Sequence, residues 1–121
     1  MDTVFLKGLT LTTRIGVFAE EQGHKQELIV DLDIEVKDNL SHQTDALADT
    51  LDYASLSRRL REWSSRQDCD LLEKFAEHLC VFIFTSYPLA QTIYLTLHKP
   101  PAACALGLSD VGLKISRHRS A

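Results

Sequence analysis

This chain of 121 residues has few cysteines, no excess of basic residues and no long apolar run. These three features argue against a disulfide or metal site, a nucleic-acid partner and a membrane span. The three cysteines, Cys69, Cys80 and Cys104, are odd in number and their spacing matches no metal-binding motif, which favours free thiols in a reducing cytoplasm. The five histidines form no metal-binding motif either. The sequence therefore predicts neither a disulfide framework nor a metal site.

The charge balance and the hydropathy exclude two further classes of partner. The net charge is −4 at pH 7, so no basic excess favours nucleic acid or an anionic membrane. The longest unbroken apolar run, Leu79 to Phe84, is far too short to span a bilayer. The first residues, Met1 to Val4, lack the basic and apolar regions of a secretory signal. These features predict a cytoplasmic protein without a membrane or nucleic-acid partner.

The composition is that of an ordinary globular domain, with 45% hydrophobic and 25% charged residues. No repeat, low-complexity tract or linker divides the chain. A chain of this length buries about two-thirds of its unfolded surface when it folds as one unit. We therefore expect residues 1–121 to form a single domain.

Four stretches alternate apolar and polar residues, which is typical of half-buried strands. They run from about residue 4 to 16, 27 to 36, 92 to 99 and 111 to 117. The clearest is 27–36, whose apolar positions share one face while acidic residues occupy the other. The pair Pro100 and Pro101 ends the third strand, because proline supplies no N–H to a sheet ladder.

Two amphipathic helices lie between the strand pairs. The first begins near Asp52, and the second opens with Asp70 as its predicted N-cap and Glu73 in the capping-box position. The order ββααββ predicts an α+β domain with a four-stranded antiparallel sheet and two helices on one face. Because the other face and both edges stay open, we expect copies of the chain to join edge to edge into an oligomeric barrel.

Four ionisable residues stand where these elements begin or end, namely Glu21, Tyr53, Glu73 and Lys99. Lys99 closes the third strand on the same face as its apolar row, so its amine lies at the rim of the sheet. An amine placed there loses part of its hydration and becomes a usable base. Two acids, a phenol and a lysine at element boundaries are typical of one catalytic pocket.

Each of these residues also has a purely structural explanation, and the residues alone leave both explanations open. Lys99 fits a strand-end lysine that extends into water, and Glu21 fits a solvated hairpin turn. Tyr53 lies on the apolar stripe of its helix, as a core tyrosine with a bonded hydroxyl does. Glu73 with Asp70 fits a capping box, which would keep its carboxylate from a ligand.

Four segments in order resemble the dihydroneopterin aldolase family over essentially the whole chain. They are residues 15–22 with Gln26 ahead of 28–34, residues 51–56, residues 71–77, and Lys99-Pro100 followed by 111–117. The resemblance implies the tunnelling fold (T-fold), in which four subunits close a barrel and two such rings commonly stack. It therefore implies a homo-oligomer, a tetramer or an octamer, with active sites between neighbouring subunits.

The resemblance also implies a reaction, the retro-aldol cleavage of 7,8-dihydroneopterin in folate biosynthesis. The products are 6-hydroxymethyl-7,8-dihydropterin and glycolaldehyde, and epimerisation at the 2′ carbon is an expected side activity. Lys99 would remove the side-chain hydroxyl proton, Tyr53 would deliver a proton to the intermediate, and Glu21 would orient Lys99 and the hydroxyl groups.

The pterin ring of the substrate would be held by a second group of residues. Glu73 would accept bonds from the ring, the backbone N–H of Leu72 would hold the ring carbonyl, and backbone of Leu51 would come from the neighbouring subunit. The family needs no metal, no other cofactor and no Schiff base, since the ring C=N can hold the electrons of the broken bond.

Other functions on related folds remain open at this point. One is a dihydroneopterin triphosphate 2′-epimerase, although no basic cluster suited to a triphosphate is evident. A second is a non-catalytic pterin-binding barrel, and a third, a metal-dependent cyclohydrolase-type enzyme, would need Cys and His ligands that the sequence does not offer. The apolar segment 102–108, expected to be a loop at the site, leaves the stereoselectivity undetermined.

Overall fold

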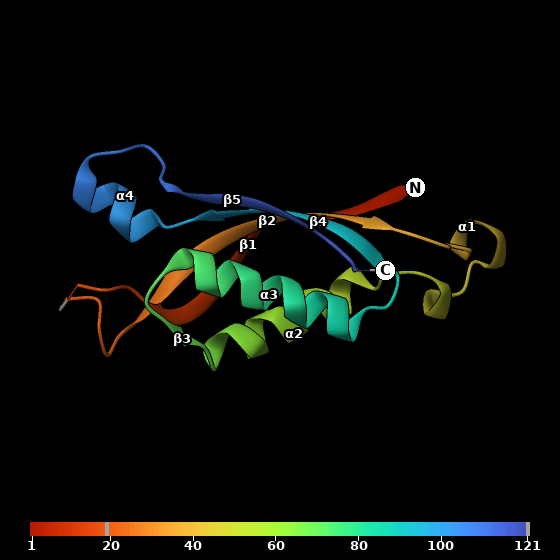
Figure 1. Cartoon of the computed structure of the whole chain (residues 1–121), viewed down its shortest axis with the longest axis horizontal. Coiled ribbons are helices and arrows are strands. Elements are labelled where there is room, and N and C mark those ends of the chain that lie inside the picture. Colours follow the sequence, from red (N-terminus) through yellow and green to blue (C-terminus); the bar gives the residue numbers. More distant parts are fainter. Residues whose placement is uncertain (19, 121) are drawn as a thin grey trace.

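A computed structural model describes residues 1–18 and 20–120, and it places both long helices on one face of a twisted sheet (Figure 1). The strands are β1 (Asp2–Ile15), β2 (Lys25–Val36), β3 (Asp68–Cys69), β4 (Ala90–His98) and β5 (Gly112–His118). The helices are α1 (Ser41–Thr44), α2 (Tyr53–Ser65), α3 (Leu72–Ser86) and α4 (Pro100–Leu106), with a 3-10 turn, η1, at Leu47–Asp49.

The sheet has the strand order β3-β1-β2-β4-β5. The pairs β1–β2, β2–β4 and β4–β5 are antiparallel, which confirms the predicted α+β fold and its four antiparallel strands. The additional strand, β3, has two residues and pairs in parallel with the end of β1, Asp68 with Arg14 and Cys69 with Ile15. β3 was not predicted, because two residues are too few to show an alternating pattern.

The start of α3 differs from the prediction because of β3. The chain stays extended through this strand and on to Leu71, which is the residue that precedes the helix. Asp70 is therefore not the N-cap, and no side chain caps this helix. The capping box predicted for Asp70 and Glu73 is wrong, so that helix start does not occupy the Glu73 carboxylate.

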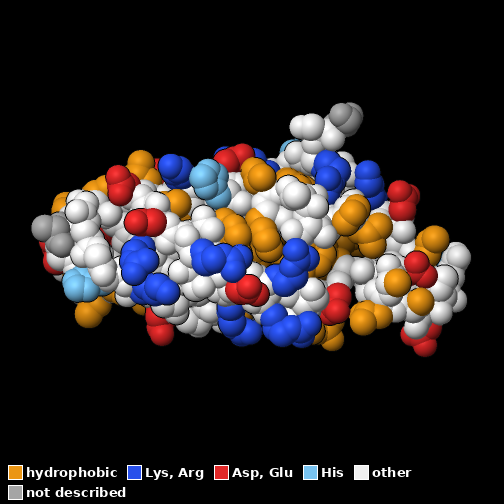
Figure 2. All heavy atoms as spheres, turned by 90° about the horizontal axis from the view of Figure 1, so that it is seen from below, with side chains coloured by type: hydrophobic (Ala, Val, Ile, Leu, Met, Phe, Trp, Pro, Cys, Tyr) orange, Lys and Arg blue, Asp and Glu red, His pale blue; other side chains and the backbone are white. Residues whose placement is uncertain are grey.

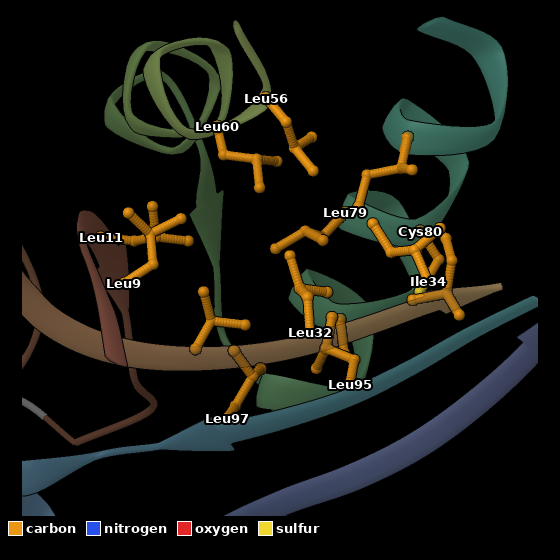
Figure 3. Packing of buried hydrophobic residues seen from close by; sticks show 14 of the residues in the cluster. Leu9, Leu11, Leu32, Ile34, Leu56, Leu60, Leu79, Cys80, Leu95 and Leu97 are labelled. Carbon is orange, nitrogen blue, oxygen red and sulfur yellow. The ribbon is translucent and has the colours of Figure 1, made fainter. Parts of the chain in front are cut away.

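The hydrophobic core lies between the sheet and the two long helices (Figure 3). Leu28, Leu32 and Ile34 of β2 are fully buried, as the alternation predicted. The later half of β1 alternates as predicted too, with its odd positions from Leu9 to Ile15 buried. A bulge at Gly8, where φ is +72°, shifts the pairing register between the two halves of that strand.

The opposite face of the sheet is polar and carries a hydrogen-bonded cluster around His98. The His98 ring bonds through Nε2 to Asp31 Oδ2 at 2.9 Å and through Nδ1 to Asp110 Oδ2 at 2.8 Å. The backbone N–H of Gly8 donates to Asp31 Oδ1 at 2.8 Å. The cluster therefore ties β4 to β2 and to the turn that leads into β5.

The Pro100–Pro101 pair ends a strand, as predicted, and it also begins a helix. β4 stops at His98, and α4 starts at Pro100, so the segment expected to be an apolar loop is largely helical. Proline is favoured in the first turn of a helix, because an N–H group at that position would have no acceptor within the helix. Lys99 is the residue between the strand and this helix.

The molecule has two ends that matter for function, at opposite ends of the sheet (Figure 1). The lysine end contains α4, the β1–β2 connection and the start of α3, and the tyrosine end contains the start of β1, η1 and the start of α2. Seen from the helix side, basic and acidic side chains spread over the surface between the two ends (Figure 2). Within the described residues no helix has both the length and the apolar character to cross a membrane.

Candidate active site

Two of the predicted site residues meet at the lysine end, although they are 78 positions apart in the chain. Lys99 Nζ donates to Glu21 Oε2 at 2.5 Å, and only 13% of the Lys99 side chain and 15% of the Glu21 side chain are exposed. The structural explanations of a water-facing lysine and a solvated turn acid are therefore wrong. The contact places an amine and a carboxylate together where β4 ends.

The backbone around Glu21 is shaped to hold its carboxylate. Gly16 follows β1 with φ +134°, and a Cβ atom at this position would overlap the Glu21 side chain. Gln26 Nε2 donates to Glu21 Oε2 at 3.2 Å and to the Ile15 carbonyl at 2.8 Å. The Phe18 N–H donates to Glu21 Oε1 at 3.4 Å. These contacts join the end of β1 to the start of β2 and fix the acid between them.

Sequence reasoning assigned no role to Gly16 or Gln26. The sequence did contain a signal for both. Gly16 comes directly after a strand and five residues before Glu21, and the amide of Gln26 stands at the start of the next strand. Both residues belong to the segments that carried the family resemblance. Their function follows only from the folded hairpin, which brings the two strand ends together.

The electrostatics of the site keep Glu21 ionised. The hydrogen bond from Lys99 is the largest influence and lowers the pKa of the Glu21 carboxyl, and the bonds from Gln26 and from the Phe18 N–H act in the same direction. Burial acts against them and raises the pKa, but the net shift is downward. Glu21 is therefore a hydrogen-bond acceptor throughout the neutral pH range.

Glu21 lies between two cavities of different character. The first, of about 550 Å³, is lined by the polar side chains of Glu20, Glu21, Gln26 and Lys99. Apolar side chains complete its lining, Phe18 from the β1–β2 connection and Pro101, Ala102, Ala105 and Leu106 from α4. The second cavity, of about 330 Å³, is polar and lined by Arg14, Asp68 and Asp70 among others, and Asp70 lies shortly before the start of α3.

Glu73 and Leu72 also lie at the lysine end, in the first turn of α3. The first backbone bond of this turn runs from the Phe75 N–H to the Leu71 carbonyl, so the N–H groups of Leu72 and Glu73 have no acceptor within the helix. The Glu73 side chain is exposed. The helix start thus offers a carboxylate acceptor and backbone donors next to each other.

Tyr53 and Leu51 lie at the tyrosine end. The Tyr53 side chain is 66% exposed, so its interpretation as a core tyrosine is wrong. It lines a cavity of about 620 Å³ with Val4 and Phe5 of β1, and Leu51 lines the same cavity. Ten residues of β1 separate Phe5 from Ile15, which corresponds to about 33 Å of extended strand. One chain therefore brings Glu21 and Lys99 together, with Glu73 at the same end, but it cannot bring Tyr53 to them.

Two of the three thiols are buried, and no metal-binding group is found near the site among the described residues. Cys69 and Cys80 are buried, and burial raises the pKa of the Cys80 thiol to about 12. Among residues 1–18 and 20–120, no group of three or more His, Cys, Asp and Glu side chains is placed to hold a metal ion. The reactive groups of the lysine end thus include its amine, its carboxylates and the exposed thiol of Cys104 in α4.

Comparison with known proteins gives consistent matches over the whole length of the chain. The family model described as dihydroneopterin aldolase matches residues 4–116. A dihydroneopterin aldolase of Haemophilus influenzae is 31% identical over 117 residues, which cover 97% of both chains. The crystal structure of Escherichia coli dihydroneopterin aldolase with neopterin superposes with a TM-score of 0.86, 26% identity and coverage of 97% and 99%. A Vibrio cholerae structure provisionally assigned the same activity gives a TM-score of 0.88, 34% identity and 98% coverage of both chains.

Proposed function

This chain belongs to the dihydroneopterin aldolase family, and on that basis we propose that it cleaves 7,8-dihydroneopterin in folate biosynthesis. The C1′–C2′ bond of the substrate breaks after the proton of the 2′-hydroxyl is removed. C2′ leaves as the aldehyde carbon of glycolaldehyde, and C1′ gains a proton to give 6-hydroxymethyl-7,8-dihydropterin. The observation that carries this proposal is the Lys99–Glu21 contact beside a cavity at the end of β4.

Lys99 acts in removal of the hydroxyl proton, directly or through one water molecule. Its amine is fixed by Glu21 at 2.5 Å, and a fixed group within hydrogen-bond reach is what general acid–base catalysis requires. Because Glu21 stays ionised, its carboxylate also accepts bonds from substrate hydroxyl groups. The same pair supports a side activity as 2′-epimerase. The C1′–C2′ bond can re-form after the bound aldehyde has rotated to present its other face, and this inverts C2′.

Glu73 and Leu72 anchor the pterin ring. A carboxylate accepts two parallel N–H donors, as the 2-amino group and the adjacent ring N–H present them. The Leu72 N–H, without an acceptor in its own helix, donates to the ring carbonyl oxygen. The support for this assignment is the exposed position of Glu73 and the absence of a capping bond at the start of α3.

Tyr53 and the backbone of Leu51 come from a second copy of the chain, and Tyr53 delivers the proton to C1′. The support is the separation of the two ends along β1, together with exposed apolar side chains at both. Phe5 and Leu47 are 63% and 67% exposed at the tyrosine end, and Phe18 and Leu106 are 63% and 67% exposed at the lysine end. Head-to-tail contact between unlike ends produces a closed ring, a tetramer or a stacked octamer.

Mixing two inactive variants tests this shared site. Lys99→Ala has a defective lysine end and Tyr53→Phe a defective tyrosine end, so each alone is expected to be nearly inactive. When the two are co-expressed, about a quarter of the interfaces pair an intact lysine end with an intact tyrosine end. Recovery of about a quarter of the wild-type activity supports sites between subunits, and no recovery contradicts them.

The reaction proceeds without a metal and without a Schiff base. The dihydropterin ring has a C=N bond next to the bond that breaks, and this bond accepts the electrons that an imine would otherwise take. Borohydride added during turnover should therefore fail to attach substrate to Lys99, and mass spectrometry of the protein checks this. A reduced adduct on Lys99 would instead identify an imine mechanism.

The activity itself is tested by incubating the protein with 7,8-dihydroneopterin and measuring both products. Glycolaldehyde and 6-hydroxymethyl-7,8-dihydropterin should form in equal amounts. Formation of the 2′ epimer without glycolaldehyde would identify an epimerase, and tight binding of the pterin without either product would identify a non-catalytic barrel.

A further inference from the structure

Helix α4 contributes to the lining of the cavity that holds Lys99 and Glu21, yet it packs little against the rest of the molecule. It projects beyond the sheet at the lysine end (Figure 1), and Ala103 is its only buried residue. Ala102 and Ala105 are among the residues with which it lines the cavity. A helix with so little packing depends on the contacts at its two ends for its position.

The two ends of this excursion are tied together where the chain leaves β4 and returns to β5. The Lys99 N–H donates to the Val111 carbonyl at 2.9 Å, and His98 Nδ1 bonds to Asp110 Oδ2 at 2.8 Å. Gly112 permits this close approach, because a Cβ atom at that position would overlap the backbone of β4. A backbone bond and a side-chain bond thus close the base of the segment that carries α4.

We propose that Asp110 is a positioning residue of this site, which holds α4 beside the cavity through protonated His98 and releases it when His98 loses its proton. The effect on the substrate rests on the proposed aldolase function, whereas the hold on α4 does not. Release should weaken substrate binding, because α4 supplies part of the cavity lining. The contact between Lys99 and Glu21 does not involve α4 and should persist.

The hydrogen bonds of the His98 ring explain why release follows the proton. A protonated imidazole donates from both nitrogens, and a neutral one donates from one only. The bond to Asp31 should survive, since its side chain is 27% exposed against 59% for Asp110, and the Gly8 N–H also fixes it. The bonds to Asp31 and Asp110 raise the pKa of His98 against the opposing effect of burial, so the ring is charged at pH 6.

Other charged groups near the ring come from the three strands around it. Lys7 of β1 acts weakly on Asp31 and is itself paired with a carboxylate of β2. Glu27 of β2 and Lys114 of β5 hold neighbouring positions on the same sheet face, with opposite charges. Helix α4 itself contains no charged residue. The two carboxylates bonded to the ring, those of Asp31 and Asp110, therefore govern its titration.

Hydrogen exchange of residues 100–108 at pH 6 tests the hold directly in Asp110→Ala. A charged bond with one exposed partner shifts an equilibrium by about 2- to 5-fold, so these amides should exchange faster by about that factor. Glu62→Ala is the matched control, because it removes an exposed carboxylate and its ion pair with Arg66 on α2 and should leave this exchange unchanged. Unchanged exchange in Asp110→Ala overturns the inference.

Steady-state kinetics with 7,8-dihydroneopterin test the consequence for the substrate at pH 6 and pH 9. At pH 6 Asp110→Ala should raise KM by up to the same factor and change kcat less. At pH 9, where His98 has lost its proton, the KM values of wild type and variant should agree. The ratio of the two KM values at each pH cancels the titration of Lys99, which both proteins share.

A KM ratio that is the same at pH 6 and pH 9 overturns the inference. Because Leu106 of α4 lies among the residues proposed to contact the next copy, the variants are compared at a concentration where light scattering gives the wild-type assembly. If the wild type does not cleave 7,8-dihydroneopterin, the proposed function fails, and the exchange measurement still decides whether Asp110 holds α4.

Discussion

Removal of His98 should destabilise the protein by an amount that depends on pH. In the wild type the ring lies between two carboxylates, Asp31 of β2 and Asp110 of the turn before β5, at 2.9 and 2.8 Å. Both ring nitrogens donate when the imidazole is protonated, so His98→Asn removes a positive charge and at least one charge-assisted bond. Lys7 bonds to Asp33 and has only the smallest influence on Asp31, so it does not replace the bond from His98.

The magnitude follows from how exposed each partner is. The bond to Asp31 joins side chains that are 24% and 27% exposed, and such a charged bond contributes about 1.5 kcal/mol. The Asp110 side chain is 59% exposed, so its bond contributes about 0.5 kcal/mol, as exposed ion pairs do. His98→Asn should thus lower the free energy of unfolding by about 2 kcal/mol at pH 6.

The sign of the pH dependence follows from the two pKa shifts. The bonds to Asp31 and Asp110 raise the pKa of His98 against the opposing effect of burial, so its contribution is complete below about pH 6.5 and is lost as pH rises through the folded-state pKa. The His98 bond lowers the pKa of Asp31, whose contribution is complete above about pH 4 and is lost as pH falls further. The cluster is therefore fully effective between about pH 4 and 6.5.

Urea unfolding at pH 6 and pH 9, at one fixed protein concentration, measures this effect. The difference between wild type and His98→Asn should be about 2 kcal/mol at pH 6 and should fall below about 1 kcal/mol at pH 9. His24→Asn, at an exposed position in the β1–β2 connection, is the matched control and should change stability little at either pH. A difference for His98→Asn that is the same at both pH values would refute the reasoning.

Three further substitutions test the proposed site. Lys99→Ala should leave pterin binding largely intact and lower turnover by ~10²-fold or more, and full activity in a steady-state assay would contradict its role. Glu73→Ala should weaken pterin binding by about 2–4 kcal/mol in calorimetry, because it removes two charge-assisted bonds, and unchanged affinity would exclude Glu73 as the anchor. Gly16→Ala should cost about 1–3 kcal/mol of stability and displace the Glu21 carboxylate, which lowers activity. Gly23→Ala is its control, since φ there is +79° but a Cβ atom would meet no atom within 4 Å; equal loss of activity in both would refute the displacement.

The main strands could be predicted from the sequence because their alternation is a local pattern. The apolar positions of β2 and of the later half of β1 are buried as expected, and the strand before Pro100 ends where the missing N–H of proline requires. In each case neighbouring residues determine the local structure.

The errors came from contacts between distant segments. Asp70 and Glu73 have the spacing of a capping box, but pairing of Cys69 with Ile15 keeps the chain extended, so the helix starts later. Tyr53 lies on a helical apolar stripe, yet its position at the end of the sheet exposes it. Nothing in the local sequence around Lys99 indicates an acid 78 residues earlier. Their shared placement at element boundaries suggested one pocket, and the family resemblance suggested that Glu21 orients Lys99.

The length of β1 has a consequence for how members of this fold can vary in sequence. In the proposed ring, this strand separates the residues that a subunit contributes to one site from those that it contributes to the next, so its length sets the spacing of the sites. Insertion of two residues in each strand of the β1–β2 hairpin would preserve its alternation and its core, yet it would move the two ends apart by about 7 Å. Every site in the assembly would lose its geometry at once, while each subunit could still fold. Length changes should therefore be tolerated in connections away from the site residues, such as residues 37–46, and eliminated by selection in the hairpin.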